Sequence, residues 1–351
     1  MGSQTGEGRV DRVTGLVQSQ VARYRVIHRG LLICLLIALA TTFIADHYGG
    51  PTLLYALLFG MSLHFLSDNE SCRPGVEFTA RTVLRFGVAL LGARMTYAQV
   101  EALGVGPVVL VVIAVAVVIF GGALIARVLG LPRDLGLLTG GAVAICGASA
   151  ALALSAVMPK HETHERNTIL TVVGVTTLST VAMVTYPLIV GALGLSDAQA
   201  GIFLGATIHD VAQVVGAGYM ISEQAGDTST LIKLLRVAML VPVVLVFMWV
   251  FRNQTAGDSS TGRPVMLPGF LVAFIALVVV NSVGLIPDSV GEGLSNVSRW
   301  SLVAAISALG IKTSFQKLAV VGWRPVFLML IETGLLLVLV LAVVLYASLG
   351  A

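Results

Sequence analysis

The chain has 351 residues, of which 57% are hydrophobic and 11% are charged, and its mean hydropathy is +0.95. A soluble domain carries about 25% charged residues, so this composition excludes a water-soluble globular protein and indicates a helical membrane protein. The net charge of +3 forms no basic patch, and we expect no nucleic-acid partner. The three cysteines are Cys34, Cys72 and Cys146. Their number is odd and they lack metal-ligand spacing, so we expect neither disulfides nor a metal or other cofactor.

Residues 1–29 are polar and carry five arginines. No signal-peptide cleavage pattern follows, so we interpret the first apolar stretch as a membrane span. A helix needs about 20 apolar residues to cross the hydrocarbon, and on this criterion we expect eleven helices. Their ranges are 30–48, 51–66, 77–96, 105–127, 136–158, 167–190, 199–222, 230–251, 268–286, 298–314 and 320–349. The second and tenth are short, which is typical of tilted, re-entrant or broken helices.

The distribution of basic residues predicts the orientation. With a cytoplasmic N-terminus, fourteen lysines and arginines fall on cytoplasmic segments and five on outer segments. This bias favours an odd number of helices with the C-terminus in the periplasm of a bacterial inner membrane.

Two motifs occur twice, about 150 residues apart. Residues 58–64 (LFGMSLH) return as 203–209 (FLGATIH), and 83–86 (VLRF) return as 234–237 (LLRV). The paired helices are five apart, so they run in opposite directions, and internal symmetry of this kind is typical of transporters with inverted repeats. We therefore expect a cytoplasmic segment 1–29, a first repeat within 30–190 that includes the start of the sixth helix, a second repeat 167–314, and an additional C-terminal helix 320–349.

The expected fifth helix contains a run of small residues, 140–150 (GGAVAICGASA). Glycine weakens a helix, and a broken helix would present free N–H groups and a positive dipole end to an anion. By symmetry the tenth helix would be broken near Ser307 and Gly310 and would cross the fifth. The alternative is two intact helices with tight packing faces. The broken-helix interpretation predicts substrate contacts at Cys146, Gly147, Ala148, Ser149, Ser307 and Gly310.

Polar residues in apolar spans give further candidates. His209, Asp210 and Gln213 lie in the seventh helix, where His209 and Gln213 would share a face. Ionisable groups at membrane depth are functional-site hypotheses by default, and histidine titrates near neutrality, so this cluster is a candidate for ion coupling. The alternative is a structural hydrogen-bonded cluster. Arg85 and Arg236 either bind the anion or extend to the membrane surface.

Five motifs together resemble the YeiH-type bacterial membrane proteins, a family named for sulfate export. They are 92–94 (GAR), 145–150 (ICGASA), 209–215 (HDVAQVV), 233–242 (KLLRVAMLVP) and 308–313 (ALGIKT). The resemblance runs over about residues 30–349. It implies a relation to the bile-acid symporter and sodium/proton antiporter group, whose five-plus-five inverted repeat contains two crossing broken helices. Asp210 departs from the glutamate expected at its position.

The sequence as a whole predicts an all-α polytopic protein that transports a small anion, sulfate or a sulfonate, by alternating access. A passive anion channel is the alternative. An intramembrane enzyme is disfavoured, because no nucleophile, base and oxyanion site converge around Cys146 or around the His209–Asp210 pair. The expected partners are the anion, a coupling proton or sodium ion, and the lipid bilayer. The substrate, the direction of transport, the coupling ion and homo-oligomerisation stay open.

Overall fold

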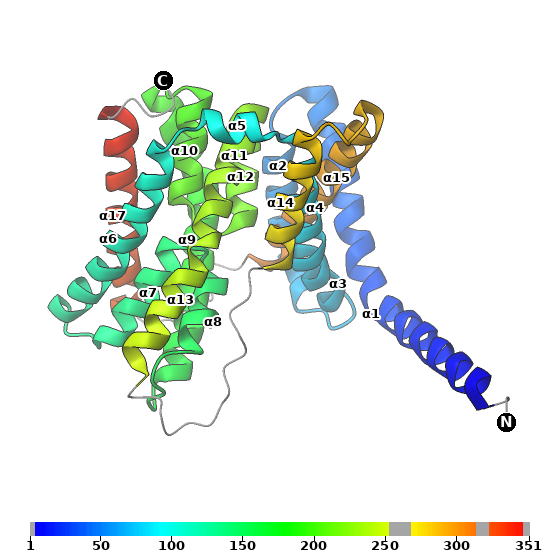
Figure 1. Cartoon of the computed structure of the whole chain (residues 1–351), viewed down its shortest axis with the longest axis horizontal. Helices are drawn as coiled ribbons and strands as arrows, with labels where there is room; N and C mark the ends of the chain where they lie inside the picture. The colour runs from blue at the N-terminus through cyan, green and yellow to red at the C-terminus, as the bar shows by residue number, and fades with distance from the viewer. Residues whose placement is uncertain (1–3, 253–267, 314–322, 347–351) are drawn as a thin grey trace. The chain divides into compact units, whose positions relative to one another are not determined.

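Figure 1 shows the computed structural model of the protein, which describes residues 4–252, 268–313 and 323–346. The first half contains α1 (Gln4–Tyr48), α2 (Thr52–Ser62), η1 (His64–Ser67), α3 (Arg73–Phe78), η2 (Thr79–Val83), α4 (Leu84–Leu91), η3 (Gly92–Arg94), α5 (Tyr97–Ala102), α6 (Gly106–Val128), α7 (Arg133–Ala144) and α8 (Ala148–Ser155). The second half contains α9 (His164–Leu193), α10 (Asp197–Thr207), α11 (Val211–Ile221), α12 (Glu223–Ala238), α13 (Leu240–Phe251), α14 (Gly269–Ser282), α15 (Asp288–Lys312) and α17 (Trp323–Tyr346).

The expectation of an all-helical membrane protein is confirmed. Within the described ranges, six helical segments are long and apolar enough to cross a membrane. Large apolar side chains are exposed along several of them, for example Leu36 on α1, Phe120 on α6 and Trp249 on α13. Exposed apolar faces of this extent are typical of surfaces that contact lipid. The expected connection at 253–268 lies largely outside the described residues.

The chain divides into two compact units, which are described separately. Unit 1 comprises residues 1–85 and 303–312, and unit 2 comprises residues 86–302 and 313–351. This division follows packing and not the expected repeat, whose boundaries stay a prediction.

In unit 1, the small residues near the end of α15 serve close helix packing. A Cβ atom on Gly60 of α2 would lie 2.3 Å from the Ser307 carbonyl oxygen, and one on Gly310 would lie 2.3 Å from the Leu57 carbonyl oxygen. Helix α15 continues through Lys312, and the Ser307 hydroxyl donates to the Val303 carbonyl one turn back at 2.9 Å. The prediction of a broken helix near Ser307–Gly310 is therefore wrong, because glycine and serine here let α2 approach an intact helix.

In unit 2, α7 and α8 form a hairpin. The predicted interruption near Cys146–Ser149 is confirmed, since α7 ends at Ala144 and α8 begins at Ala148. A straight continuation would separate Gly141 from Leu154 by about 20 Å. A Cβ atom on Gly141 of α7 would instead overlap the Leu154 side chain of α8. The expected spanning helix 136–158 is thus two short helices that fold back on each other.

A second hairpin replaces the expected continuous helix 199–222. Helix α10 ends at Thr207, α11 begins at Val211, and both pack on α12. Cβ atoms on Gly201 of α10 and on Gly218 of α11 would each lie 3.1 Å from the same atom, the Ala225 carbonyl oxygen. In a straight helix these residues would be about 25 Å apart. The expectation of one continuous helix over 199–222 is therefore wrong, and the break at 208–210 contains no glycine that would mark it in the sequence.

The two hairpins open at opposite ends of α9. At its N-terminal end, the Ser155 hydroxyl of α8 contacts His164 at 2.8 Å and Thr168 at 2.7 Å. At its C-terminal end, Gly194 (φ 62°) ends α9, and Ser196 begins α10 with a capping box completed by Gln199. In Figure 1, α7 and α8 accordingly lie in the lower part of unit 2, and α10 and α11 lie in the upper part.

Helix α17 is an integral part of unit 2. It packs against α6, α7, α9 and α10. Its residues Leu328, Met329, Glu332 and Leu336 are buried. The segment expected as an additional C-terminal helix therefore helps to enclose both hairpins.

Candidate functional site

The bends of the two hairpins meet inside unit 2. We call residues 145–147 the first tip and residues 208–210 the second tip. A Cβ atom on Gly147 would lie 3.6 Å from the His209 carbonyl oxygen. Gly147 has φ 64° and ψ −125°, a backbone conformation that residues with a side chain rarely adopt. Gly147 thus allows both the turn and the close approach of the second tip.

Lys233 of α12 joins the two tips. Its ammonium group donates to the Ile145 carbonyl at 2.8 Å, the Ile208 carbonyl at 3.0 Å and the His209 carbonyl at 2.5 Å. The side chain is fully buried. An ammonium group has three donors, so these bonds use all of them.

Arg236, one turn further along α12, also binds both hairpins. Its Nε donates to the Ala144 carbonyl at 2.9 Å and its Nη2 to the Val143 carbonyl at 2.8 Å. Its Nη1 donates to the carbonyls of Gly205 at 3.0 Å and Ile208 at 2.9 Å. The last carbonyls of a helix have no partners within the helix and carry the negative end of its dipole. Two buried cations therefore neutralise the C-terminal ends of α7 and α10.

The second helix, or second arm, of each hairpin (α8 in the first and α11 in the second) begins differently. Helix α8 begins after Gly147 and has no side-chain cap. Its first residues are accessible, since Ala148 is half-buried and Ser149 is exposed. Helix α11 is capped by Asp210, whose Oδ1 accepts from the Ala212 N–H at 3.1 Å. Helix α8 thus begins without a capping carboxylate, whereas at the second tip a carboxylate of the protein caps the helix.

The second tip is fixed to the middle of α9. Ser179 accepts from the Asp210 N–H at 3.0 Å and donates to Gln213 at 3.3 Å, and Gln213 donates to Thr180 at 3.3 Å. His209 contacts the Thr333 hydroxyl of α17 at 3.0 Å. His209 lies before the helix begins, so the expectation that it shares a helical face with Gln213 is wrong. The two side chains bind different helices.

The structure brings together most of the predicted site residues. Those at the two tips or bound to them are Cys146, Gly147, Ala148, Ser149, His209, Asp210, Gln213 and Arg236. Ser307 and Gly310 belong to unit 1, and so does Arg85, which is exposed on α4. Arg236 donates its hydrogen bonds to backbone carbonyls of both hairpins. It therefore holds the hairpins together, and its positive charge acts on the tips.

The members of the repeated motif pairs have unlike surroundings. His64 is part-buried and contacts the Ile311 carbonyl at 2.7 Å, whereas His209 is fully buried beside Thr333. Arg85 is exposed and Arg236 is buried.

The sequence did not single out two residues that are important in the structure. Lys233 and Glu332 could each have been assigned to a membrane surface, yet both are fully buried. The sequence did hold a signal for Lys233. It precedes Arg236 by three residues in one apolar helix, and two cations on one helical face at membrane depth need acceptors.

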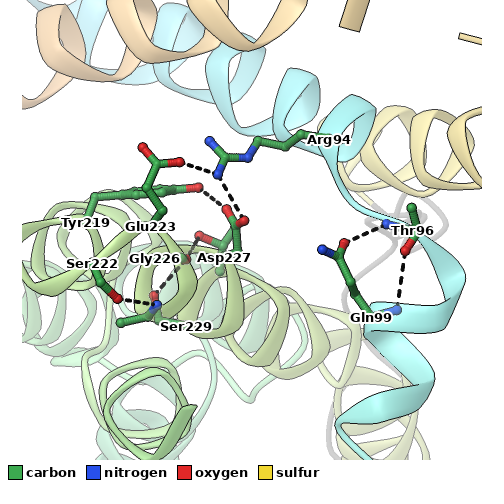
Figure 2. Close-up of polar contacts among 11 residues, drawn as sticks. Arg94, Thr96, Gln99, Tyr219, Ser222, Glu223, Gly226, Asp227 and Ser229 are labelled. Atoms are coloured by element: carbon green, nitrogen blue, oxygen red, sulfur yellow. Dashed lines mark hydrogen bonds and ion pairs between the residues drawn. The ribbon is translucent and has the colours of Figure 1, made fainter. Parts of the chain in front are cut away.

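A charged cluster lies where α11 meets α12 (Figure 2). Arg94 of η3 contacts Glu223, and it contacts Asp227 at 3.1 Å. The Tyr219 hydroxyl donates to the other oxygen of Asp227 at 2.5 Å. Burial by itself lowers the pKa of Arg94, but the facing Tyr219, Asp227 and Glu223 outweigh this effect and raise it. Arg94 therefore stays charged. It links η3 to the base of the second hairpin, by which we mean the open end of the hairpin, where α11 meets α12.

Comparison with known proteins identifies relatives along nearly the whole chain. A family model described as "Conserved hypothetical protein 698" matches residues 29–329. The "UPF0324 membrane protein" of Chlorobaculum tepidum is 50% identical over 95% of this chain and 94% of its own. "UPF0324 membrane protein TauZ" of Paracoccus denitrificans is 50% identical over 89% of this chain and 93% of its own, and a relative from Rhizobium meliloti is 48% identical over 89% and 91%. No solved structure matches the chain.

Proposed function

The chain belongs to the UPF0324 family of bacterial membrane proteins, and we propose that it is a secondary active transporter of small anions. The proposed substrate is sulfate or a sulfonate, moved across the inner membrane by alternating access. The chain would act as a carrier and not as an enzyme.

The observation that carries the proposal is the meeting of two oppositely opening hairpins around Lys233 and Arg236. Transporters commonly bind their substrates near the bilayer midplane, where discontinuous helices present unpaired ends. Non-helical backbone at this depth is tolerated where it is enclosed by protein or lines a cavity. Hairpins that open at opposite ends of α9 would expose their tips to opposite sides of the membrane, so movement of one hairpin at a time would give alternating access.

The first tip supplies the donors for the anion. The N–H groups of Ala148 and Ser149 belong to the first turn of α8, whose N-cap residue Gly147 supplies no side-chain cap. Lys233 and Arg236 provide two positive charges beside Asp210, the only acidic residue of the two tips. Hydrogen bonds to a charged group contribute about 1.5–3 kcal/mol each. A sulfate or sulfonate, with several acceptor oxygens and a permanent charge, suits this arrangement.

One relative's name supports the sulfonate. The name TauZ hints at a role related to taurine, which is a sulfonate. We extend this hint to the present chain as part of the proposal.

An inverted repeat remains part of the proposal, although the motif pairs that suggested it lie in unlike surroundings. Two hairpins of opposite direction are what an inverted repeat would produce. The equivalence is therefore better sought between α7–α8 and α10–α11 than between Arg85 and Arg236.

The hairpins also sharpen the proposed orientation. A re-entrant α7–α8 hairpin keeps Lys160 and Arg166 on the same side as Arg127 and Arg133, which raises the cytoplasmic set of basic residues from fourteen to sixteen. We retain a cytoplasmic N-terminus and a periplasmic C-terminus. A C-terminal alkaline phosphatase fusion should be active and a fluorescent-protein fusion dark, and the reverse pattern would refute this orientation.

Transport is tested with purified protein in liposomes, by counterflow of labelled taurine and sulfate. Ala148→Pro removes one N–H donor from the first turn of α8, where proline is tolerated, and the preceding Gly147 is not helical. This variant should bind the anion less tightly, whereas Ser149→Ala, which keeps the N–H, should bind it nearly as well as the unmodified protein. Absence of counterflow for sulfate, sulfite, taurine and carboxylates would reject the carrier. Single-channel currents would instead assign a channel, and chemical conversion of the solute an enzyme.

A further inference from the structure

Glu332 of α17 is a fully buried carboxyl group that the proposed anion site does not use. It lies between α6 and α7. A Cβ atom on Gly122 of α6 would be 2.5 Å from Glu332 Oε1, and the Thr139 hydroxyl of α7 is 2.8 Å from the same oxygen. Glu332 Oε2 is buried and has no hydrogen-bond partner. A carboxyl group in this position requires a specific explanation.

The hydrogen bonds of Thr139 are compatible with a protonated carboxyl group. The Thr139 hydroxyl is 2.9 Å from the Leu135 carbonyl oxygen, one turn back on α7, and 2.8 Å from Glu332 Oε1. A hydroxyl has a single proton to donate, and a backbone carbonyl can only accept. If the hydroxyl donates to Leu135, Glu332 must donate to Thr139, which requires a proton on the carboxyl group. Both contacts are then satisfied.

The surroundings of Glu332 favour the same neutral form. The groups that face it from α6 and α7 are Gly122 and Thr139, which are uncharged. Among the described residues, no lysine, arginine or histidine forms an ion pair with it. The cations of unit 2 nearest to the tips, Lys233 and Arg236, donate to backbone carbonyls. An isolated carboxylate in such a place would carry a large desolvation cost, and a proton removes that cost.

The position of Glu332 links the proton to both hairpins. Glu332 contacts Thr139 on the first arm of the first hairpin, and the next residue, Thr333, contacts His209 at the second tip. His209 is thus the titratable group nearest to Glu332 in the series of contacts that runs from Glu332 through Thr333. Loss of the Glu332 proton to water would reverse this hydrogen bond, so that Thr139 donates to the carboxylate, and would place a negative charge against α7.

We propose that Glu332 is the proton-binding residue of this transporter, taking up a proton from water on one side of the membrane and releasing it to water on the other as the first hairpin moves. This inference rests on the proposed function. It differs from proton coupling by His209 and Asp210, because Asp210 already serves as the cap of α11 and His209 as a partner of Thr333.

The proton itself can be detected without transport. The infrared spectrum of the purified protein should contain the carbonyl stretch of a protonated carboxylic acid, and this band should be lost in Glu332→Gln. The control Glu292→Gln, at an exposed position of α15, should keep the band. Absence of the band from the unmodified protein, or its persistence in Glu332→Gln, would overturn the proposal.

Coupling is tested in liposomes with an imposed pH gradient. One pH unit corresponds to about 1.36 kcal/mol per proton, enough for about tenfold accumulation of an anion carried with one proton. The ratio of gradient-driven accumulation to counterflow should fall about tenfold in Glu332→Gln and stay unchanged in Glu292→Gln. If Glu332→Gln is unstable, Thr139→Val provides the second variant and should shift the pH profile, whereas Thr139→Ser should restore it.

The failures of the two proposals are distinguishable. If the unmodified protein shows the infrared band but no counterflow, the transport function fails and the proton site stands. If it shows counterflow, but accumulation follows a sodium gradient or is lost in Asp210→Asn and kept in Glu332→Gln, the coupling role of Glu332 is rejected and the transporter stands.

Discussion

The two hairpin tips are alike where the first arm ends and differ where the second arm begins. In both, the C-terminal carbonyls of the first arm bind Lys233 and Arg236. The second arm of the first hairpin begins without a side-chain cap, and that of the second begins with the carboxylate of Asp210. Under the proposed function, the first tip binds an external anion, while the second is completed by the carboxylate of Asp210.

Removing the shared cation should have the largest effect. Arg236→Met leaves the carbonyls of Val143, Ala144 and Gly205 without this partner. Bonds to charged groups contribute about 1.5–3 kcal/mol each, so we expect a loss of at least about 3 kcal/mol in the free energy of unfolding. Thermal unfolding in detergent measures it. Arg127→Met, at an exposed position of α6, should change stability by less than about 0.5 kcal/mol. Equal melting of the two variants would contradict the shared role of Arg236.

A change confined to the first tip should be smaller and should affect anion binding directly. Gly147→Ala places a side chain at φ 64° and should cost about 1–3 kcal/mol. Relief of this strain would reorient the N–H groups of α8, so the affinity for taurine or sulfate in calorimetry should fall. The matched control is Gly191→Ala in α9, where a Cβ atom would meet no atom within 4 Å. Normal anion affinity in Gly147→Ala would show that the anion binds elsewhere.

The second tip should depend on its cap more than on the charge of Asp210. Asparagine caps a helix as well as aspartate does, whereas alanine costs about 1 kcal/mol. Asp210→Ala should therefore lower the melting temperature, and Asp210→Asn should leave it nearly unchanged. Removal of the negative charge in Asp210→Asn should also strengthen anion binding. Equal destabilisation by the two substitutions would mean that the charge itself holds the tip together.

The smallest effects on stability are expected from substitutions at the bases of the two hairpins. The first base carries the exposed pair Asp134–His161, and the second carries the partly buried cluster of Arg94 with Glu223 and Asp227. Exposed ion pairs contribute about 0–1 kcal/mol. We expect about 1 kcal/mol from Arg94→Gln and almost nothing from His161→Gln. Unfolding at low and high salt measures both, and the effect of Arg94→Gln should shrink as salt screens the charges. The reverse order of the two effects would show that the first hairpin depends more on its base.

The sequence by itself determined the class of the protein and one of its two tips. An apolar composition with few charges leaves no alternative to lipid-embedded helices, because every backbone polar group must be satisfied within the membrane. The break at Gly147 was predictable, since glycine is the residue that adopts its backbone conformation without strain. The apolar positions and small residues of 140–150 marked the place, but they contained no information on the direction of the chain after the turn.

Only the tertiary structure decided which run of small residues is broken. Small residues permit both an unwound helix and a close helix crossing, and local composition does not separate the two. At 143–145 and at 205–208, the carbonyls freed by a break find donors on Lys233 and Arg236. At Ser307–Gly310, α15 keeps its own hydrogen bonds and α2 packs against its backbone. A helix in lipid breaks where another part of the fold supplies partners for the exposed carbonyls, and that supply depends on contacts far apart in the sequence.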